Sequence, residues 1–255
     1  MRLTLVNRNT VFMKTAILSD IHSNATALLA VLRNIESSGV DSIISLGDNI
    51  GYGPEPEKVI NIIRAKEIPS VTGNHELGVI QPGFLAIFNP VARTSIEMTI
   101  DLLSDDSKRH LKSFSNTIVQ DDCRFVHGFP PESPTKYLFE VSNEEIKQTL
   151  ASMNERFCFI GHTHDLEIIT LEADKDMLSR KPLKKGSLTL DPANKYLINA
   201  GSVGQPRDGN NQAKYIIWDS SACELTVKFV SYNISDTVKK IYKAGLPEQH
   251  ALRLM

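Results

Sequence analysis

The first half of the chain alternates short apolar runs with segments whose apolar residues recur at helical spacing. Apolar runs at 14–19 and 42–46 predict two strands, and Asn24 is a suitable cap for a helix between them. The apolar stripe of that helix comprises Leu28, Leu29, Leu32 and Ile35. This strand–helix–strand order favours parallel neighbouring strands.

Start signals predict further helices along the chain. Asn89-Pro90 places a cap residue before a first-turn proline, and Ser142 followed by Glu145 forms a capping box. Ser235 is predicted to cap the last helical segment. A short strand is expected at 70–72, and a hairpin at 117–120 and 124–126.

The second half is richer in strand patterns than the first. A buried strand is predicted at 157–160, and strands separated by turns follow at 166–172, 187–190, 196–200, 214–218 and 225–230. The first half therefore predicts β-α-β units and the second half mainly antiparallel strands. Two packed sheets with helices outside accommodate both patterns.

Polar side chains follow five of the predicted strands. They are Asp20, His22, Asp48, Asn74, His75, His127, His162 and His164. Ligands bind at the carboxyl ends of strands in α/β folds, so these side chains are expected to converge on one site. The two other histidines, His110 and His250, are interpreted as surface residues.

Composition narrows the possible classes of protein. The 255 residues are 41% hydrophobic, enough for one large domain at 13–255, and residues 1–12 form an extension of unclear role. A net charge of -2 makes nucleic-acid binding unlikely as a function. Three separated cysteines favour a reducing compartment, and no signal-peptide core or membrane span is evident. A cytoplasmic protein is therefore expected.

The clustered groups suit transition metals. Nitrogen and oxygen ligands without thiolate fit Mn, Fe, Co, Ni or Zn. Eight groups are too many for one ion, whereas two ions about 3.5–4 Å apart, bridged by a carboxylate, would use most of them. Two divalent ions, two aspartates and a hydroxide leave a charge of about +1, which attracts a phosphate ester.

The motifs Asp20-x-His22, Gly47-Asp48, Gly73-Asn74-His75-Glu76, His127-Gly128 and Gly161-His162-x-His164 occur in this order. From about Met13 to about Val230, the chain resembles the calcineurin-like metallophosphoesterase superfamily, in particular its compact bacterial and archaeal phosphodiesterase-type branch. The resemblance implies a four-layer αββα sandwich, in which helices flank two mixed β-sheets.

The resemblance also implies the role of each residue. Asp48 would bridge both metals, with Asp20, His22 and His164 completing one site and Asn74, His127 and His162 the other. A metal-bridging hydroxide would attack phosphorus, and His75 would act as general acid or transition-state stabiliser.

One departure concerns the second motif. Gly51 and Tyr52 stand where protein Ser/Thr phosphatases of this superfamily have an Asp-Arg pair, which argues against a close match to those enzymes. Arg207, in a glycine-rich turn, is a candidate replacement for the phosphate clamp. Tyr52 and Phe129 adjoin ligands in sequence and are candidates for lining the substrate pocket.

The leading interpretation is a dinuclear metal-dependent phosphoesterase acting on a small phosphorylated substrate such as a nucleotide. Monoester, cyclic diester and dinucleoside polyphosphate cleavage remain open, as do the metal, with manganese among the candidates, and the oligomeric state. The alternatives are a catalytically silent scaffold, a protein phosphatase, and a metallo-hydrolase of amides or lactams. Asn74 as a neutral ligand argues against the last.

Overall fold

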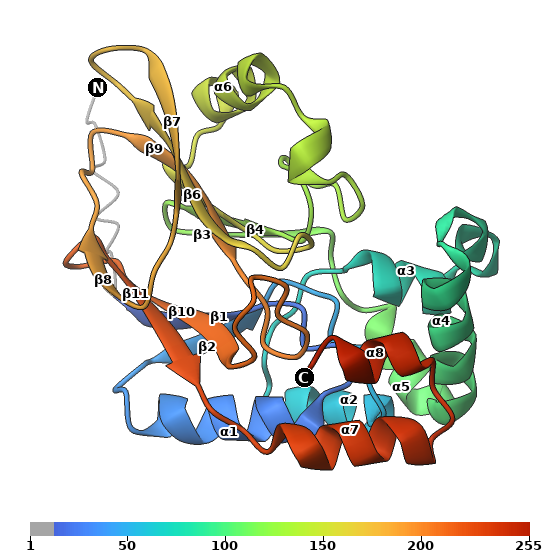
Figure 1. Cartoon of the computed structure of the whole chain (residues 1–255). Helices are drawn as coiled ribbons and strands as arrows, with labels where there is room; N and C mark the ends of the chain where they lie inside the picture. The colour runs from blue at the N-terminus through green and yellow to red at the C-terminus, as the bar shows by residue number, and fades with distance from the viewer. Residues whose placement is uncertain (1–12) are drawn as a thin grey trace, which may run out of the picture.

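Two mixed β-sheets pack face to face, and helices cover their outer faces (Figure 1). The computed structural model describes residues 13–255, so the extension at 1–12 lies outside the described residues. The first sheet has the order β2-β1-β10-β11-β8. Its strands are β1 (Lys14–Leu18), β2 (Ser42–Ser45), β8 (Gly186–Thr189), β10 (Ala213–Asp219) and β11 (Glu224–Val230).

The second sheet has the order β3-β4-β5-β9-β6-β7. Its strands are β3 (Thr117–Gln120), β4 (Cys123–Val126), β5 (Phe157–Ile160), β6 (Leu166–Glu172), β7 (Met177–Pro182) and β9 (Lys195–Ala200). In the first sheet, β1 pairs parallel with β2 but antiparallel with β10. In the second sheet, β4, β5 and β9 are parallel to one another, whereas the pairs β3–β4, β9–β6 and β6–β7 are antiparallel. The expected fold, two mixed sheets flanked by helices, is confirmed.

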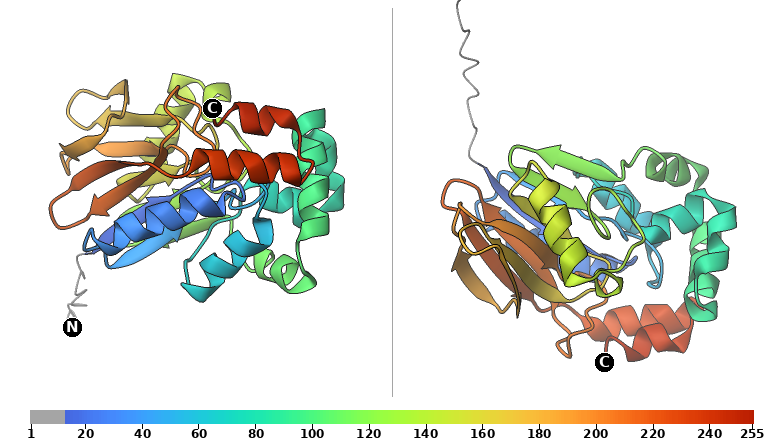
Figure 2. Two further views of the ribbon diagram at one scale, coloured as in Figure 1. Left: turned by 60° about the horizontal axis from the view of Figure 1, so that its bottom comes forward. Right: turned by 90° about the horizontal axis from the view of Figure 1, so that it is seen from above.

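Helices form the outer layers and one side of the molecule (Figure 2). They are α1 (Ala25–Glu36), α2 (Pro56–Ala65), α3 (Asn74–Ile80), α4 (Pro90–Leu102), α5 (Asp105–Leu111), α6 (Asn143–Ser152), α7 (Ile234–Lys243) and α8 (Glu248–Leu252), with 3-10 turns η1 (Pro82–Ile87) and η2 (Leu138–Glu140). α1 packs on β10 and β11, and α6 packs on β6 and β9. No helix in the described part is long and apolar enough to cross a membrane.

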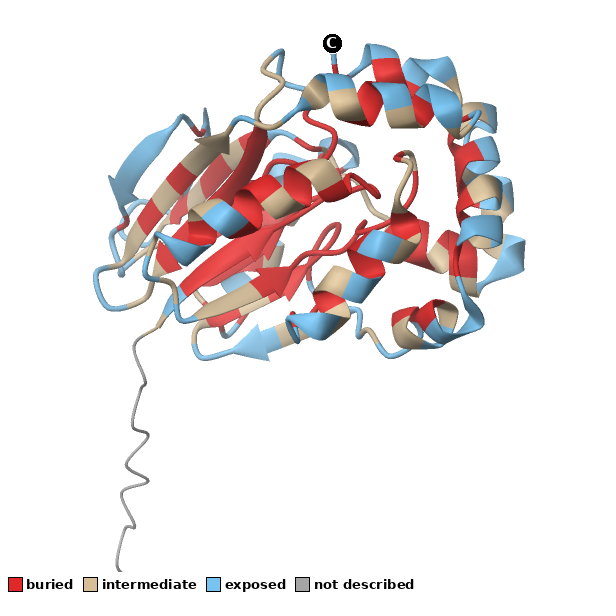
Figure 3. Ribbon diagram, turned by 90° about the horizontal axis from the view of Figure 1, so that it is seen from below, coloured by how far each residue is buried: buried red, intermediate tan, exposed pale blue. Residues whose placement is uncertain are grey.

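Side chains that alternate between the two faces of each strand divide the core into layers. In β5, Phe157 and Phe159 enter the core between the sheets, whereas Cys158 and Ile160 enter the core under α6. Successive side chains of a strand point to opposite faces, so a strand buried on both faces is apolar throughout. Figure 3 shows this continuous burial in the central strands.

Most predicted helix caps are present. The side chains of Asn24, Asn89 and Ser142 accept hydrogen bonds from backbone N–H groups at the starts of α1, α4 and α6, at 3.0–3.1 Å. Asn24 also donates to the carbonyl oxygen of Gly204, 3.0 Å away. The start of α1 is therefore tied to the loop after β9.

Three local predictions were wrong. Residues 70–72 make only isolated bridges, Ser45 to Ser70 and Val71 to Ser115, because this segment meets a different partner at each residue. Asn233, rather than Ser235, caps α7 by accepting from the N–H of Asp236. β7 was missed because it is a largely exposed edge strand without apolar alternation.

Candidate metal centre

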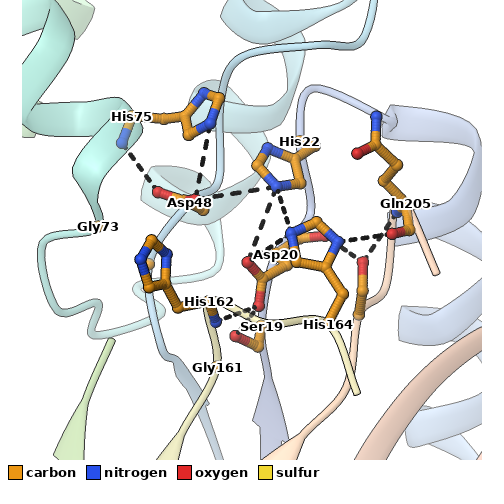
Figure 4. A network of polar contacts seen from close by, with 12 residues as sticks. Ser19, Asp20, His22, Asp48, Gly73, His75, Gly161, His162, His164 and Gln205 are labelled. Atoms are coloured by element: carbon orange, nitrogen blue, oxygen red, sulfur yellow. Dashed lines mark hydrogen bonds and ion pairs between the residues drawn. The ribbon is translucent and has the colours of Figure 1, made fainter. Parts of the chain in front are cut away.

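The predicted site residues come together just after the ends of strands from both sheets. Figure 4 shows how Asp20, His22, Asp48, His75, His162 and His164 lie. Asp20 and His22 follow β1 and Asp48 follows β2, while Asn74 and His75 begin α3. His127 follows β4, and His162 and His164 follow β5. Both sheets therefore contribute to one site, and all eight side chains are buried.

The first cluster comprises Asp20, His22 and His164. Nε2 of His22 lies 3.1 Å from Nε2 of His164, which lies 3.2 Å from Oδ1 of Asp20. The outer nitrogens of both rings donate to backbone carbonyl oxygens: His22 Nδ1 to Ile50 at 3.1 Å and His164 Nδ1 to Gln205 at 2.6 Å. A carbonyl oxygen only accepts, so these bonds place the proton on Nδ1 and direct the Nε2 lone pairs inward.

The second cluster is built in the same way around His127. Its Nε2 lies 3.3 Å from Oδ1 of Asn74 and 3.1 Å from Nδ1 of His162. The outer nitrogens of His127 and His162 donate to the carbonyl oxygens of Leu46 and Thr135, at 2.8 and 3.0 Å. Backbone acceptors behind the rings are typical of metal-ligating histidines.

Asp48 lies between the two clusters. Its Oδ2 is 3.2 Å from Nε2 of His127 and 3.8 Å from Nε2 of His22. Oδ1 of Asp20 has no hydrogen-bond partner among the described residues although it is buried. Imidazole lone pairs and carboxylate oxygens gathered in a buried space repel one another unless positive charge lies among them, so these residues fit divalent metal ions.

The pKa shifts reflect the same charge balance. Burial would lower the pKa of His127, but the carboxylates of Asp48, Asp20 and Glu76 together outweigh burial and raise this pKa to about 9. Burial lowers the pKa of His162 to about 3 and raises that of Asp20 to about 6. The position beside Asp48 thus favours positive charge.

Backbone strain is concentrated at the same residues. Asp20, His22, Asp48, His162 and His164 all have positive φ, between 47° and 70°. This conformation is costly for residues other than glycine and persists only where the surroundings enforce it, often at functional sites. Gly161 allows the close approach, because a Cβ there would lie 1.9 Å from Oγ of Ser19.

Glu76 holds the loop of Asp48 against the start of α3. Its carboxylate accepts from the N–H groups of Asp48, Asn49 and Gly73 at 2.8–2.9 Å, and it is fully buried. In addition, Oδ1 of Asp48 accepts from the N–H of His75 at 2.9 Å. Apart from the presence of Glu76 in the motif, no sequence pattern indicated this role.

His75 lies beside the clusters, with Nε2 3.9 Å from Oδ2 of Asp48. Its Nδ1 is buried without a hydrogen-bond partner among the described residues. A Cβ on Gly51, which has φ +82°, would lie 2.0 Å from this nitrogen. The glycine therefore makes room for the ring, and a carboxylate at position 51 could not orient His75 without displacing it.

Arg207 is exposed in the loop after β9, and its Nη2 lies 3.3 Å from Oε1 of buried Gln205. Nη1 of Arg253, beyond α8, lies 3.4 Å from the same oxygen. Asp208 is instead paired with the buried Lys214 at 2.7 Å. Two guanidinium groups thus lie together near the centre, and sequence reasoning missed the second.

Two interpretations of individual residues need correction. His250 is buried, 2% exposed, because α8 packs its ring 4.6 Å from that of Tyr52. Phe129 lies in the core under α6 and does not line the site. Tyr52 does adjoin it, 4.5 Å from the His22 ring. Tyr137, whose ring stacks on His162 at 3.6 Å, was missed because only tertiary packing brings it there.

Buried clusters of histidine and carboxylate, where strands of two mixed sheets end, offer the ligands of a metal-dependent enzyme. The family model of the calcineurin-like phosphoesterase superfamily domain matches residues 13–222. The chain belongs to this superfamily, and phosphate esters are the class of substrate it indicates.

Related proteins agree with this assignment. An uncharacterised protein of Methanocaldococcus jannaschii is 34% identical over 245 residues, covering 94% of this chain and 96% of that protein. A metallophosphoesterase from Sphaerobacter thermophilus is 35% identical with a TM-score of 0.81, covering 95% of this chain and 98% of that one. A hypothetical protein from Pyrococcus horikoshii, at 16% identity, TM-score 0.76 and 94% and 97% coverage, shares the fold.

Metal affinity should fall as the pH is lowered. A metal ion must displace the proton of His127, whose pKa is about 9, so affinity should drop by up to about tenfold per pH unit below pH 9. Asp20, with a pKa of about 6, adds a second competing proton below pH 6. Chelator competition from pH 9 to pH 4 measures this effect. Metal retained at pH 4 would contradict the prediction.

Replacing Glu76 with alanine should destabilise the protein. Three buried N–H groups would lose their acceptor, at about 1–3 kcal/mol each, so the free energy of unfolding should fall by about 3 kcal/mol or more. Urea unfolding measures the loss, with the exposed Glu132→Ala as control. A Glu76→Ala protein as stable as this control would show that the carboxylate does not hold the two segments together.

Proposed function

We propose that this protein is a dinuclear metal-dependent phosphoesterase acting on small phosphorylated substrates. The observation that carries the proposal is the convergence of inward-facing imidazole nitrogens on the Asp48 carboxylate. Asp20, His22 and His164 would hold one ion and Asn74, His127 and His162 the other, with Asp48 between them.

The bound metals and the residues of the chain would have different roles in the reaction. Two bound divalent ions would act as Lewis acids, lowering the pKa of a water and neutralising charge on the phosphate. The backbone carbonyl groups behind the rings fix the imidazole tautomers. The strained strand ends hold the ligands in place before substrate arrives, which reduces reorganisation during the reaction.

His75 is proposed to act on the leaving oxygen. Burial lowers its pKa to about 4, so the neutral ring offers a single N–H at neutral pH. His22, Asp48 and His75 also lie close enough together to hold an ion, but we assign His75 to hydrogen bonding because the other two clusters already offer ligands for two ions.

Arg207 is proposed to bind the phosphate. Burial lowers the pKa of His164, and the positive charge of Arg207 lowers it further, which supports a place for this guanidinium near the centre. Arg253 shares the Gln205 oxygen with it and adds a second charge. A pair of guanidinium groups favours an anionic substrate.

A panel of substrates and metals tests the function. Phosphomonoesters, phosphodiesters, nucleotides and dinucleoside polyphosphates should be assayed with Mn, Fe, Co, Ni and Zn, and the metal content measured in parallel. Hydrolysis of one ester class, dependent on metal, is expected. A protein that binds two metals per chain and cleaves none of the esters would instead be a silent scaffold.

Replacement of His75 with alanine should lower kcat about 10²-fold, because a positioned acid or hydrogen-bond donor contributes by that order. Bound metal should stay at the wild-type level. Steady-state kinetics with metal analysis measures both, and His110→Ala, on α5, is the control. Full turnover by His75→Ala would remove the residue from the mechanism.

Replacement of Arg207 with alanine should raise KM about tenfold with metal content unchanged, because a hydrogen bond from a charged donor is lost. Arg33→Ala, exposed on α1, is the control, and Arg253→Ala should give a smaller increase in KM. An unchanged KM in Arg207→Ala would show that this guanidinium does not bind substrate.

A further inference from the structure

A cavity of about 250 Å³ opens directly beside the metal centre. Asn74 and His162, both proposed ligands, form part of its lining and are buried. Three aromatic side chains, Tyr52, Phe88 and Tyr137, also line it, and Ile87 lies at its edge with 63% of its surface exposed. None of these aromatic rings is needed to hold metal.

The aromatic residues pack against the imidazoles of the centre. The rings of Tyr52 and Phe88 lie 4.4 and 5.5 Å from that of His75, both edge-on. Tyr137 stacks on His162 with 18° between the ring planes. The aromatic walls of the cavity are therefore held in a fixed position relative to His75 and His162. The cavity lies on the same side of the metal centre as His75.

Burial raises the pKa of Tyr52 and the Arg207 guanidinium partly offsets this rise, so the arginine pair lies near one wall of the cavity. Figure 4 places His75 and His162 at the opposite end of the network from Gln205, which contacts both guanidinium groups. A phosphate would meet positive charge near Gln205, whereas the cavity offers aromatic rings beside the polar side chains of Asn74, Asn89, Thr135 and His162. Because no Asp, Glu, Lys or Arg lines the cavity, we expect the part of the substrate that enters it to be uncharged.

We propose that the cavity binds a planar aromatic group carried by the leaving alcohol of the substrate, either a nucleobase or a simple aryl ring. This inference rests on the proposed phosphoesterase function. Apolar cavities of about 150 Å³ bind benzene, so 250 Å³ accommodates a planar ring system. Aromatic walls favour such rings through stacked and edge-on contacts.

The reaction balances as a hydrolysis. Water forms the new P–O bond, the P–O bond to the aromatic-bearing alcohol breaks, and that alcohol leaves with a proton supplied by the water. His75, against which Tyr52 and Phe88 pack, faces the departing oxygen. The cavity thus positions the leaving group and does not change the chemistry.

Substrates that share a primary-alcohol leaving group test the proposal. AMP, benzyl phosphate and ribose 5-phosphate differ in the ring they carry, and their methyl diesters replace them if the enzyme prefers diesters. A ring-bearing substrate should have a kcat/KM at least about tenfold above that of ribose 5-phosphate. Preference for AMP indicates a nucleobase site, and equal preference for AMP and benzyl phosphate a general aryl site.

Phe88→Ala should reduce this preference, the ratio of kcat/KM for a ring-bearing ester to that for ribose 5-phosphate, to below about threefold. Phe114→Ala, a half-buried phenylalanine that packs on His110, should keep the preference. Calorimetry with adenosine or benzyl alcohol, without phosphate, gives a second readout, in which Phe88→Ala should weaken binding about tenfold. Equal use of all three esters, unaffected by Phe88→Ala, would overturn the aromatic site and leave the phosphoesterase function standing. Hydrolysis of no ester would overturn the function itself.

Discussion

The candidate metal centre depends on bringing the lone pairs of several imidazole nitrogens and carboxylate oxygens together in a buried space. Four imidazole rings donate outward to backbone carbonyl groups, so their inner nitrogens face one another and the carboxylates of Asp20 and Asp48. Such a cluster is unfavourable unless positive charge occupies it. The left-handed backbone at five of these residues is a second cost. Both costs are reasonable for a protein that gains its stability elsewhere and uses this site to bind cations.

That stability comes from the sandwich. The core between the sheets fixes β1 and β2 relative to β4 and β5, and therefore fixes the distance between the two halves of the site. Glu76 and the close contact at Gly161 then join the loops themselves. Asp48 follows a strand of one sheet and His127 a strand of the other, so a small change of packing between the sheets would move one relative to the other. A precise site therefore needs its ligands on rigid strands and not on long loops.

The sequence was sufficient for the features that depend on local pattern. Each strand end carried its polar residues within a few positions of an apolar run, so Asp20, Asp48 and the paired histidines at 162 and 164 could be predicted together. Features made by distant packing could not be predicted. His250 followed an amphipathic pattern and was assigned to the surface, yet α8 folds it against Tyr52. Arg253 and Tyr137 likewise reach the site only through tertiary contacts.

The residues that sequence missed share a structural origin. Phe88 follows η1, Tyr137 precedes η2, and His250 and Arg253 come from α8 or the residue after it, so all four lie outside the sheets that carry the proposed ligands. Changes in these segments can alter the cavity and the charge around the site while leaving the strand ends in place. Gly51 links the sheets that carry the proposed ligands to the segments that form the cavity, because its lack of a side chain gives the His75 ring room beside Tyr52. The proposed metal centre and the proposed leaving-group cavity therefore depend largely on different parts of the chain, and they adjoin at Asn74 and His162.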